Sequence, residues 1–364
     1  MSARTERPTV PTAVRERVRT QLPRVEAAGL RAAMGLPERV QRLLAGKPVV
    51  REGQTLATDL QLMLRLQRVA RKVAAETLPV PEGRLALAES TALIAGRQPI
   101  GSVRDLQVAG QCARLYTPSG VSGDAGPLLV FFHGGGFIYC DLETHDAGCR
   151  FLAERSGVRV LSVEYRLAPE APFPAAHDDA VAAYRWVLEN LDTLGADRDR
   201  LAVGGDSAGG NLAASVAITA AQEGLPLAFQ LLVYPMTDGS GTMPSRTAYG
   251  KGFFLTAEFM DLASRSFAPT PEQGGDPRLS VLHADLPPGL APAYVATAGF
   301  DPLRDEGEAY ARKLADAGVG VELRRFRDQI HGFLNIVGVG RSSRAANAEI
   351  AARLRAGLGA AAQR

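Results

Sequence analysis

Residues 200–209 read Arg200-Leu201-Ala202-Val203-Gly204-Gly205-Asp206-Ser207-Ala208-Gly209. The first five positions have the pattern of a short buried strand, and residues 211–222 have the unbroken, alanine-rich pattern of a helix. Ser207 is therefore predicted on a sharp strand-to-helix turn, with small residues at 205 and 209 where strand and helix pass closely. The helix N-terminus behind Ser207 favours negative charge that develops nearby. The alternative is a glycine-rich turn that only caps a helix with a serine.

A second glycine-rich signature, His133-Gly134-Gly135-Gly136-Phe137, follows the apolar strand pattern of residues 127–132. Consecutive glycines leave backbone N–H groups unshielded, so two of them and a third from the serine turn can converge on a tetrahedral oxyanion. We assign this oxyanion-binding role to Gly134, Gly135 and Ala208. His133 is expected to order the glycines by hydrogen bonding. The alternative is a flexible loop without a catalytic role.

A nucleophilic serine needs a base, and the base needs a carboxylate that orients it. Where the serine lies on a strand-to-helix turn of this kind, the chain order is serine, acid, histidine. His331 fits that order, because three histidines precede Ser207 and His283 precedes the best acid candidate. Asp301 is the predicted acid, since it follows the strand pattern of residues 293–298. The alternative for Asp301 is an aspartate that caps the next helix.

Six segments of the chain resemble the bacterial hormone-sensitive-lipase-like esterases of the α/β-hydrolase superfamily. They are HGGGF at 133–137, YRLAPE at 165–170, FPAA at 173–176, GDSAGG at 205–210, DPLRDE at 301–306 and HGF at 331–333. The resemblance implies a carboxylic ester hydrolase that acts best on short or medium acyl chains through an acyl-enzyme intermediate. It also implies tolerance of bulky alcohol groups, including those of tertiary alcohols, and admits a homodimer.

Strand patterns alternate with helix patterns in the larger part of the chain. Strands are expected at 159–165 and 229–234, with a helix at 178–190 between them. This alternation predicts the α/β class, with a mostly parallel central sheet flanked by helices. Together with the resemblance, it assigns an α/β-hydrolase catalytic domain to residues 101–364.

Two further segments are expected to cover the active site. Residues 1–100 are predicted to form a helical N-terminal cap segment, because apolar residues repeat at helical spacing from Leu56 to Leu64. The stretch near 238–270 interrupts the strand–helix alternation and is predicted to be a second cap insertion.

Four residues are candidates for lining the substrate pocket. Phe137 and Asp206 belong to the two glycine-rich signatures, and Phe253 and Phe254 lie in the second cap segment. The alternative for the two phenylalanines of the cap is a place in its apolar core.

Composition excludes several classes of partner. The 41 basic and 39 acidic residues nearly balance, and no basic block alternates with aromatics, so no nucleic-acid partner is expected. Three cysteines are too few and too irregular for a disulfide framework or a zinc site, and neither a metal nor an organic cofactor is expected. The charged first 25 residues and the absence of an 18-residue apolar run predict a cytoplasmic protein without stable membrane insertion.

The expected partner is a small-molecule ester. Two alternatives stay open at this point. One keeps the fold and the triad but acts on amides, as an arylformamidase does. The other is a non-catalytic ligand-binding protein on the same scaffold, although Ser207, Asp301 and His331 are all present.

Overall fold

An eight-stranded sheet forms the centre of the computed structural model, which describes residues 28–70, 73–121, 125–241 and 243–361. The strand order is β10-β9-β8-β7-β5-β6-β4-β3. The strands from β5 to β10 pair in parallel, and β4 is antiparallel to both of its neighbours. Their bounds are β3 Ser102–Val108, β4 Gln111–Thr117, β5 Gly126–Phe132, β6 Arg159–Val163, β7 Ala196–Asp206, β8 Phe229–Val233, β9 Ala293–Phe300 and β10 Val321–Ile330. The predicted mostly parallel sheet is confirmed.

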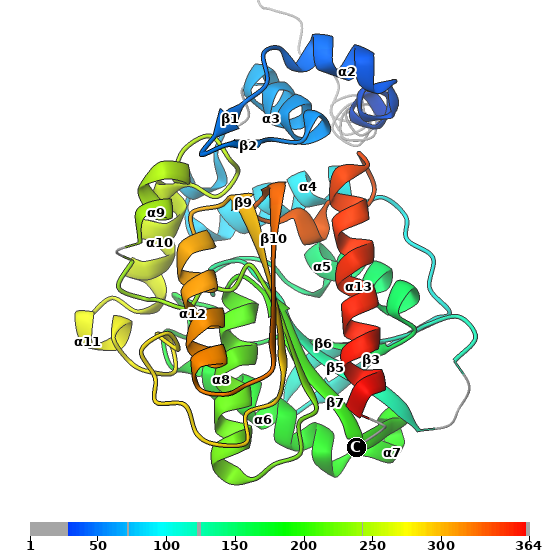
Figure 1. Cartoon of the computed structure of the whole chain (residues 1–364), viewed down its shortest axis with the longest axis vertical. Coiled ribbons are helices and arrows are strands. Elements are labelled where there is room, and N and C mark those ends of the chain that lie inside the picture. The colour runs from blue at the N-terminus through cyan, green and yellow to red at the C-terminus, as the bar shows by residue number, and fades with distance from the viewer. Residues whose placement is uncertain (1–27, 71–72, 122–124, 242, 362–364) are drawn as a thin grey trace, which may run out of the picture.

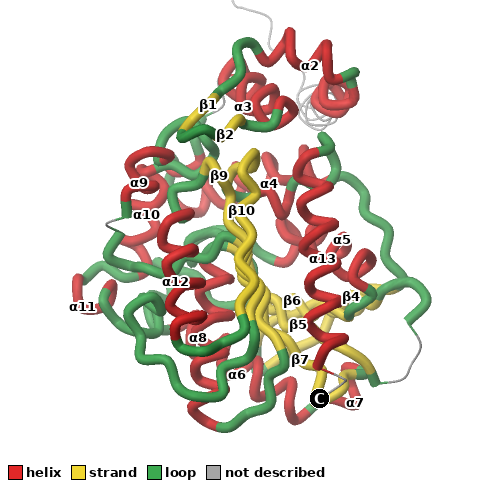
Figure 2. Tube along the Cα trace, viewed as in Figure 1, coloured by secondary structure: helices red, strands yellow, loops and turns green. Residues whose placement is uncertain are grey.

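Helices cover both faces of the twisted sheet (Figure 2). One face packs against α5 (Leu142–Ser156) and α13 (Ser342–Ala361), and the other against α6 (Ala175–Glu189), α8 (Ala208–Glu223) and α12 (Arg304–Asp316). Alternate side chains of β5 enter the two cores: Leu128 and Val130 face the side of α8, whereas Leu129 and Phe131 face the side of α5. The central strands are therefore buried on both faces, as a parallel sheet requires.

Most of the remaining described elements lie around the carboxyl end of the sheet, whereas α7 lies at its amino end (Figure 1). They are α2 Glu38–Ala45, β1 Val50–Arg51, β2 Gln54–Thr55, α3 Thr58–Ala70, η1 Ala75–Thr77, α4 Val80–Ala95, α7 Leu191–Leu194, α9 Pro244–Tyr249, α10 Ala257–Phe267, α11 Pro271–Gly274 and η2 Phe333–Asn335. The first 27 residues of the predicted N-terminal cap lie outside the described part of the chain.

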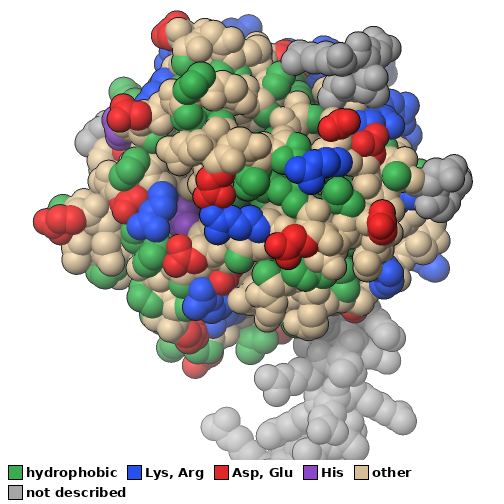
Figure 3. Space-filling view, turned by 90° about the horizontal axis from the view of Figure 1, so that it is seen from below, with side chains coloured by type: hydrophobic (Ala, Val, Ile, Leu, Met, Phe, Trp, Pro, Cys, Tyr) green, Lys and Arg blue, Asp and Glu red, His purple; other side chains and the backbone are tan. Residues whose placement is uncertain are grey.

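Charges of both signs are interspersed with apolar side chains on the face seen from below (Figure 3). This mixture agrees with the near balance of acidic and basic residues in the sequence. In the part of the chain that the structure describes, no helix combines the length and the apolar character needed to cross a membrane.

Candidate active site

Ser207 lies on the turn between β7 and α8, with φ 56° and ψ −119°. This conformation is rare for a residue with a side chain and is typical of a strained functional turn. The turn needs glycine on both sides, because a Cβ at Gly205 would lie 2.4 Å from the backbone of Gly209. A Cβ at Gly209 would lie 1.9 Å from the carbonyl oxygen of Phe132. The close passage of strand and helix expected from the sequence is thus present.

A hydrogen-bonded relay joins the three residues that the sequence singles out as nucleophile, base and acid. The Nε2 atom of His331 lies 3.0 Å from Ser207 Oγ, and its Nδ1 atom lies 2.8 Å from Asp301 Oδ2. Asp301 is fully buried, and its Oδ1 atom accepts the Leu303 N–H at 2.8 Å. Both carboxylate oxygens therefore have fixed partners, and Nδ1–H of His331 points at one of them. This leaves Nε2 free to accept the serine proton.

The oxyanion loop differs from the prediction at one position. The Gly134 N–H donates to Asp206 Oδ1 at 2.8 Å, so it is not available to a substrate oxygen. The N–H groups of Gly135, Gly136 and Ala208 have no acceptor among the described residues. Gly135 and Gly136 also line a cavity together with Ser207. This geometry does not support Gly134 as an oxyanion donor and favours Gly136 in its place.

Asp206 is a buried carboxylate that ties the oxyanion loop to the serine turn. Besides Gly134, its Oδ1 atom lies 3.1 Å from His145 Nε2, and its Oδ2 atom accepts the Tyr234 hydroxyl at 3.3 Å. Burial alone would raise the pKa of Asp206, but the charge and hydrogen bond of His145 and the Gly134 N–H outweigh it, and the pKa is lowered. Asp206 thus stays ionised and lines the cavity wall with its oxygens already engaged by the protein.

His133 stabilises the glycine loop. Its Nδ1 atom lies 2.7 Å from the Gly134 carbonyl oxygen, which can only accept, so Nδ1 carries the proton. The ring stacks on Tyr165 with centroids 4.3 Å apart, and the Tyr165 hydroxyl donates to the His133 carbonyl. Burial, together with the nearby His145, lowers the pKa of His133 to about 4. The ring is neutral at pH 7 and holds the loop, as the sequence analysis expects.

Two cavities meet at Ser207. The larger, of about 450 Å³, is lined by Ser207, His331 and residues of α3, α4 and α10. Phe254 belongs to its wall, and its ring lies so close to Gly332 that a Cβ there would be 2.9 Å from Phe254 Cε1. Phe253 is not among the described residues that line either cavity. It packs in the core against Tyr249 and Phe300, so the pocket prediction for Phe253 is replaced by the core alternative.

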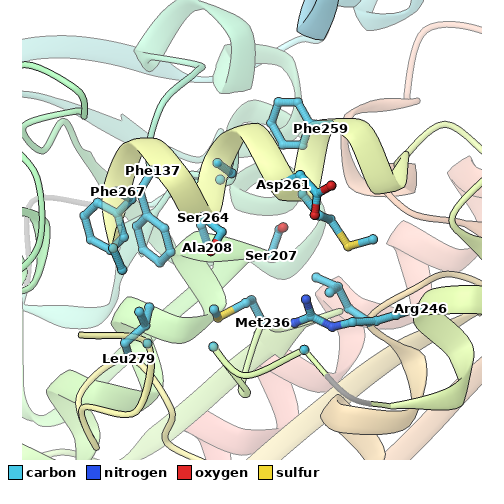
Figure 4. Close-up of a pocket in the computed structure, with 18 of the residues that line it drawn as sticks. Phe137, Ser207, Ala208, Met236, Arg246, Phe259, Asp261, Ser264, Phe267 and Leu279 are labelled. Atoms are coloured by element: carbon cyan, nitrogen blue, oxygen red, sulfur yellow. The ribbon is translucent and has the colours of Figure 1, made fainter. Parts of the chain in front are cut away.

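The smaller cavity, of about 210 Å³, lies on the other side of the serine (Figure 4). Phe137 lines it and stacks on Phe267 with ring centroids 4.1 Å apart. In Figure 4, Phe137, Phe267 and Leu279 lie on one side of Ser207 and Arg246 lies on the other. This cavity therefore has an apolar end and a polar end.

Comparison with known proteins assigns the chain to a family. A family model described as alpha/beta hydrolase fold matches residues 129–335. The chain belongs to this α/β-hydrolase family. The carboxylic ester hydrolase LipN of Mycobacterium tuberculosis (strain ATCC 25618 / H37Rv) is 43% identical over 346 residues, which cover 91% of each chain. Ethyl acetate hydrolase of Pseudomonas putida is 38% identical over 77% of this chain and 91% of its own length.

Solved structures give the same assignment for this α/β-hydrolase. The ester-hydrolase EH1AB1 from the metagenome of Lake Arreo has a TM-score of 0.80 and 40% identity, covering 84% of this chain and 99% of that chain. The esterase of Pyrobaculum calidifontis has a TM-score of 0.79 and 39% identity, covering 83% and 98%. The predicted resemblance to the hormone-sensitive-lipase-like carboxylesterases is confirmed.

Gly136 lines the cavity beside Ser207 in this α/β-hydrolase, and the sequence analysis did not single it out. The run of three glycines offers three donors, and the signal that separates them is Asp206, an acceptor fixed next to the nucleophile. Within the described ranges, no group of three or more His, Cys, Asp or Glu side chains is arranged to hold a metal ion.

Proposed function

We propose that this carboxylic ester hydrolase is a serine carboxylesterase that hydrolyses short- to medium-chain esters through an acyl-enzyme on Ser207. The observation that carries the proposal is the relay from Ser207 Oγ through His331 to Asp301, with bonds of 3.0 and 2.8 Å. Three backbone N–H groups next to the serine, without an acceptor in the part of the chain that the structure describes, supply a matching site for an oxyanion. The similarity to esterases, among them a carboxylesterase of M. tuberculosis, supports the same reaction class.

In the first half of the reaction, His331 Nε2 removes the proton of Ser207 as Oγ bonds to the ester carbonyl carbon. The carbonyl oxygen becomes an oxyanion and accepts the N–H groups of Gly135, Gly136 and Ala208. Asp301 holds the imidazolium that forms. The bond to the alcohol oxygen then breaks, and His331 donates its proton to that oxygen.

In the second half, water takes the place of the alcohol. His331 removes a proton from water as the oxygen attacks the acyl-enzyme, and the bond to Ser207 Oγ breaks. The acid leaves, and the serine recovers its proton from His331. Each oxyanion donor typically contributes about 2.7–4 kcal/mol to transition-state stabilisation.

The position of His331 supports a different arm of the ester for each of the two cavities. The leaving alcohol must lie beside His331, which protonates it, and His331 lines the larger cavity. The acyl arm then occupies the smaller cavity, which Ser207 and Ala208 line without His331. The smaller cavity, of about 210 Å³, has less than half the volume of the larger, of about 450 Å³. This difference in volume supports short acyl groups and a more spacious alcohol site.

We further propose the division into a catalytic domain at 101–364, an N-terminal cap at 1–100 and a second cap near 238–270. Residues of α3 and α4 line the larger cavity, and α10 contributes to both cavities, which supports this division. A hydrogen bond of 2.6 Å from Thr256 Oγ1 to Glu76 Oε1 joins the two cap segments.

Hydrolysis of p-nitrophenyl esters from acetate to palmitate, with Ser207→Ala alongside, tests the proposal. We expect a maximum at short or medium chains that is lost in the variant. Near-normal, saturable hydrolysis by Ser207→Ala would overturn the assignment of the nucleophile. The matched p-nitroanilides test the amide alternative, which requires the wild type to cleave them with saturable kinetics and Ser207→Ala to lose that cleavage. Ligand binding without turnover at any chain length would point to the non-catalytic alternative.

A further inference from the structure

Arg246 forms the polar end of the smaller cavity (Figure 4). Its Nε atom donates to Glu306 Oε2 at 2.9 Å, and its Nη2 atom donates to the Asp238 carbonyl at 2.7 Å. These bonds fix the guanidinium, whose side chain is only 18% exposed. Its Nη1 atom has no acceptor among the described residues. A Cβ at Gly241, another residue of the cavity wall, would lie 2.8 Å from Nη1, so the glycine leaves space for this group.

The charge around Arg246 selects the kind of oxygen that Nη1 can bind. Glu306 is fully buried and pairs with the guanidinium, while its Oε1 atom accepts the Thr237 N–H at 2.8 Å. Asp261 adds a second, exposed carboxylate to the cavity wall. Even with Glu306 protonated, Arg246 and Asp261 together carry no net positive charge. The polar end therefore offers an N–H donor without attracting an anion.

We propose that this polar end is a subsite for an uncharged oxygen on the acyl arm, so that esters of short oxo or hydroxy acids are preferred substrates. The inference rests on the proposed function, which places the acyl arm in the smaller cavity. A keto or hydroxyl oxygen accepts a hydrogen bond from Arg246 Nη1, and the chain between that oxygen and the ester carbonyl lies along the wall formed by Met236 and Leu255. Arg246 is thus a specificity-determining residue, and the chemistry at Ser207 is unchanged.

Pairs of ethyl esters with matched shapes test the subsite. Ethyl 4-oxopentanoate and ethyl 4-methylpentanoate differ in a carbonyl oxygen against a methyl group, and the 5-oxohexanoate and 5-methylhexanoate pair places the same difference one carbon further on. Monoethyl succinate presents a carboxylate of similar shape. Acid release is followed in a pH-stat, and kcat/KM is divided by the rate constant for hydroxide, which removes differences in intrinsic reactivity.

For the wild type we expect at least one oxo ester to exceed its methyl partner by about tenfold, a ratio equivalent to about 1.4 kcal/mol. The succinate monoester is expected to be the poorest substrate. Ratios within twofold for both pairs, or a preference for succinate, would overturn the inference while leaving the esterase proposal intact. If the wild type hydrolysed none of these esters and no p-nitrophenyl ester, the proposed function itself would be overturned.

Arg246→Lys assigns the preference to the guanidinium. The ammonium group can still pair with Glu306, but the fork that carries Nη1 is lost. We expect the oxo-to-methyl ratio to fall to about one, and a ratio measured on one preparation is independent of its folded fraction. Arg185→Lys, at an exposed ion pair with Glu223, is the matched control and should keep the wild-type ratio. A preference retained in Arg246→Lys would overturn the role of Arg246.

Discussion

Asp206 is the residue on which the oxyanion loop and the serine turn both depend. It is buried, and the Gly134 N–H, His145 and Tyr234 all bind its carboxylate. Asp206→Ala removes the acceptor that holds Gly134, so the loop loses its fixed position. We expect kcat to fall roughly 100-fold, as for the loss of one oxyanion donor, with KM changed much less. Steady-state kinetics with p-nitrophenyl butyrate measure this split.

Asp206→Asn is the matched control for this experiment. The amide keeps one oxygen that can accept the Gly134 N–H, so most of the kcat should be retained. If both variants lost activity equally and both unfolded at the same urea concentration as the wild type, the hydrogen bond to Gly134 would not be the cause.

The triad could be predicted from the sequence, but the choice between neighbouring glycines of the oxyanion loop could not. The chain order of Ser207, Asp301 and His331 is visible in the sequence because each follows a recognisable strand. The choice between Gly134 and Gly136 is not, since it depends on where a side chain 72 residues away places its oxygen.

The same limit applies to Phe253 and Phe254. Phe253 lies in an apolar core and Phe254 at the cavity wall, and the backbone at Phe254 has a positive φ of 80°. A positive φ is uncommon in a residue other than glycine, and the local sequence does not predict it.

At the scale of elements, Arg84 attaches α4 to the catalytic body. Its Nε atom donates to the Ile138 carbonyl at 2.7 Å, and its two terminal nitrogens bind both oxygens of Glu170 at 2.9 and 2.7 Å. Arg84→Met removes these bonds, and we expect the free energy of unfolding to fall by about 1–2 kcal/mol because the side chain is partly buried. Urea unfolding followed by circular dichroism measures the change.

Arg42→Met provides the comparison on another N-terminal helix. Arg42 and Glu38 are 68% and 61% exposed, so their pair should contribute less than about 0.5 kcal/mol. Equal destabilisation by the two variants would show that Arg84 does not anchor α4.

Element positions were predictable where periodicity is strong, and their ends were not. The helix expected from residue 211 begins at Ala208 as α8. The prediction started too late because Gly209 and Gly210 resemble a turn in sequence, whereas both are helical in the structure. The strand expected at 200–204 extends over Ala196–Asp206 as β7, because Ala196 also pairs with Gly126 of β5, and an irregularity in the register spans the charged residues between Ala196 and Leu201. Pairing with a neighbouring strand thus overrides local composition at the start of β7.

For the whole molecule, buried histidines couple stability to pH. His177 is buried among aromatic rings, and burial lowers its pKa to about 4. The unfolded chain, with a histidine pKa near 6.5, binds more protons between pH 6.5 and 4. The stabilisation is therefore complete above pH 6.5 and is lost as the pH falls towards 4, by on the order of 3 kcal/mol. Urea unfolding at pH 7.5 and pH 4.5 measures this loss.

His177→Gln isolates the contribution of this histidine. Burial also raises the pKa of Glu306 to about 7. The contribution of this carboxyl to the free energy of unfolding therefore falls as the pH rises from about 4.5 to 7, which is opposite in sign to the effect of His177. Because Glu306 is present in both proteins, its effect cancels in their difference. We expect the variant to lose less stability than the wild type between the two pH values. An identical loss in both proteins would contradict the assignment to His177.

The measurement that tests the central claim most directly is covalent labelling with diethyl p-nitrophenyl phosphate, read by intact-mass and peptide mass spectrometry. The phosphoryl group bonds to the activated oxygen and is not removed by the deacylation step. We predict one diethylphosphoryl group per chain, on the peptide that carries Ser207, with esterase activity lost in proportion and no label in Ser207→Ala. Full hydrolytic activity in the labelled protein, or a label on another residue that accounts for the lost activity, would contradict the account.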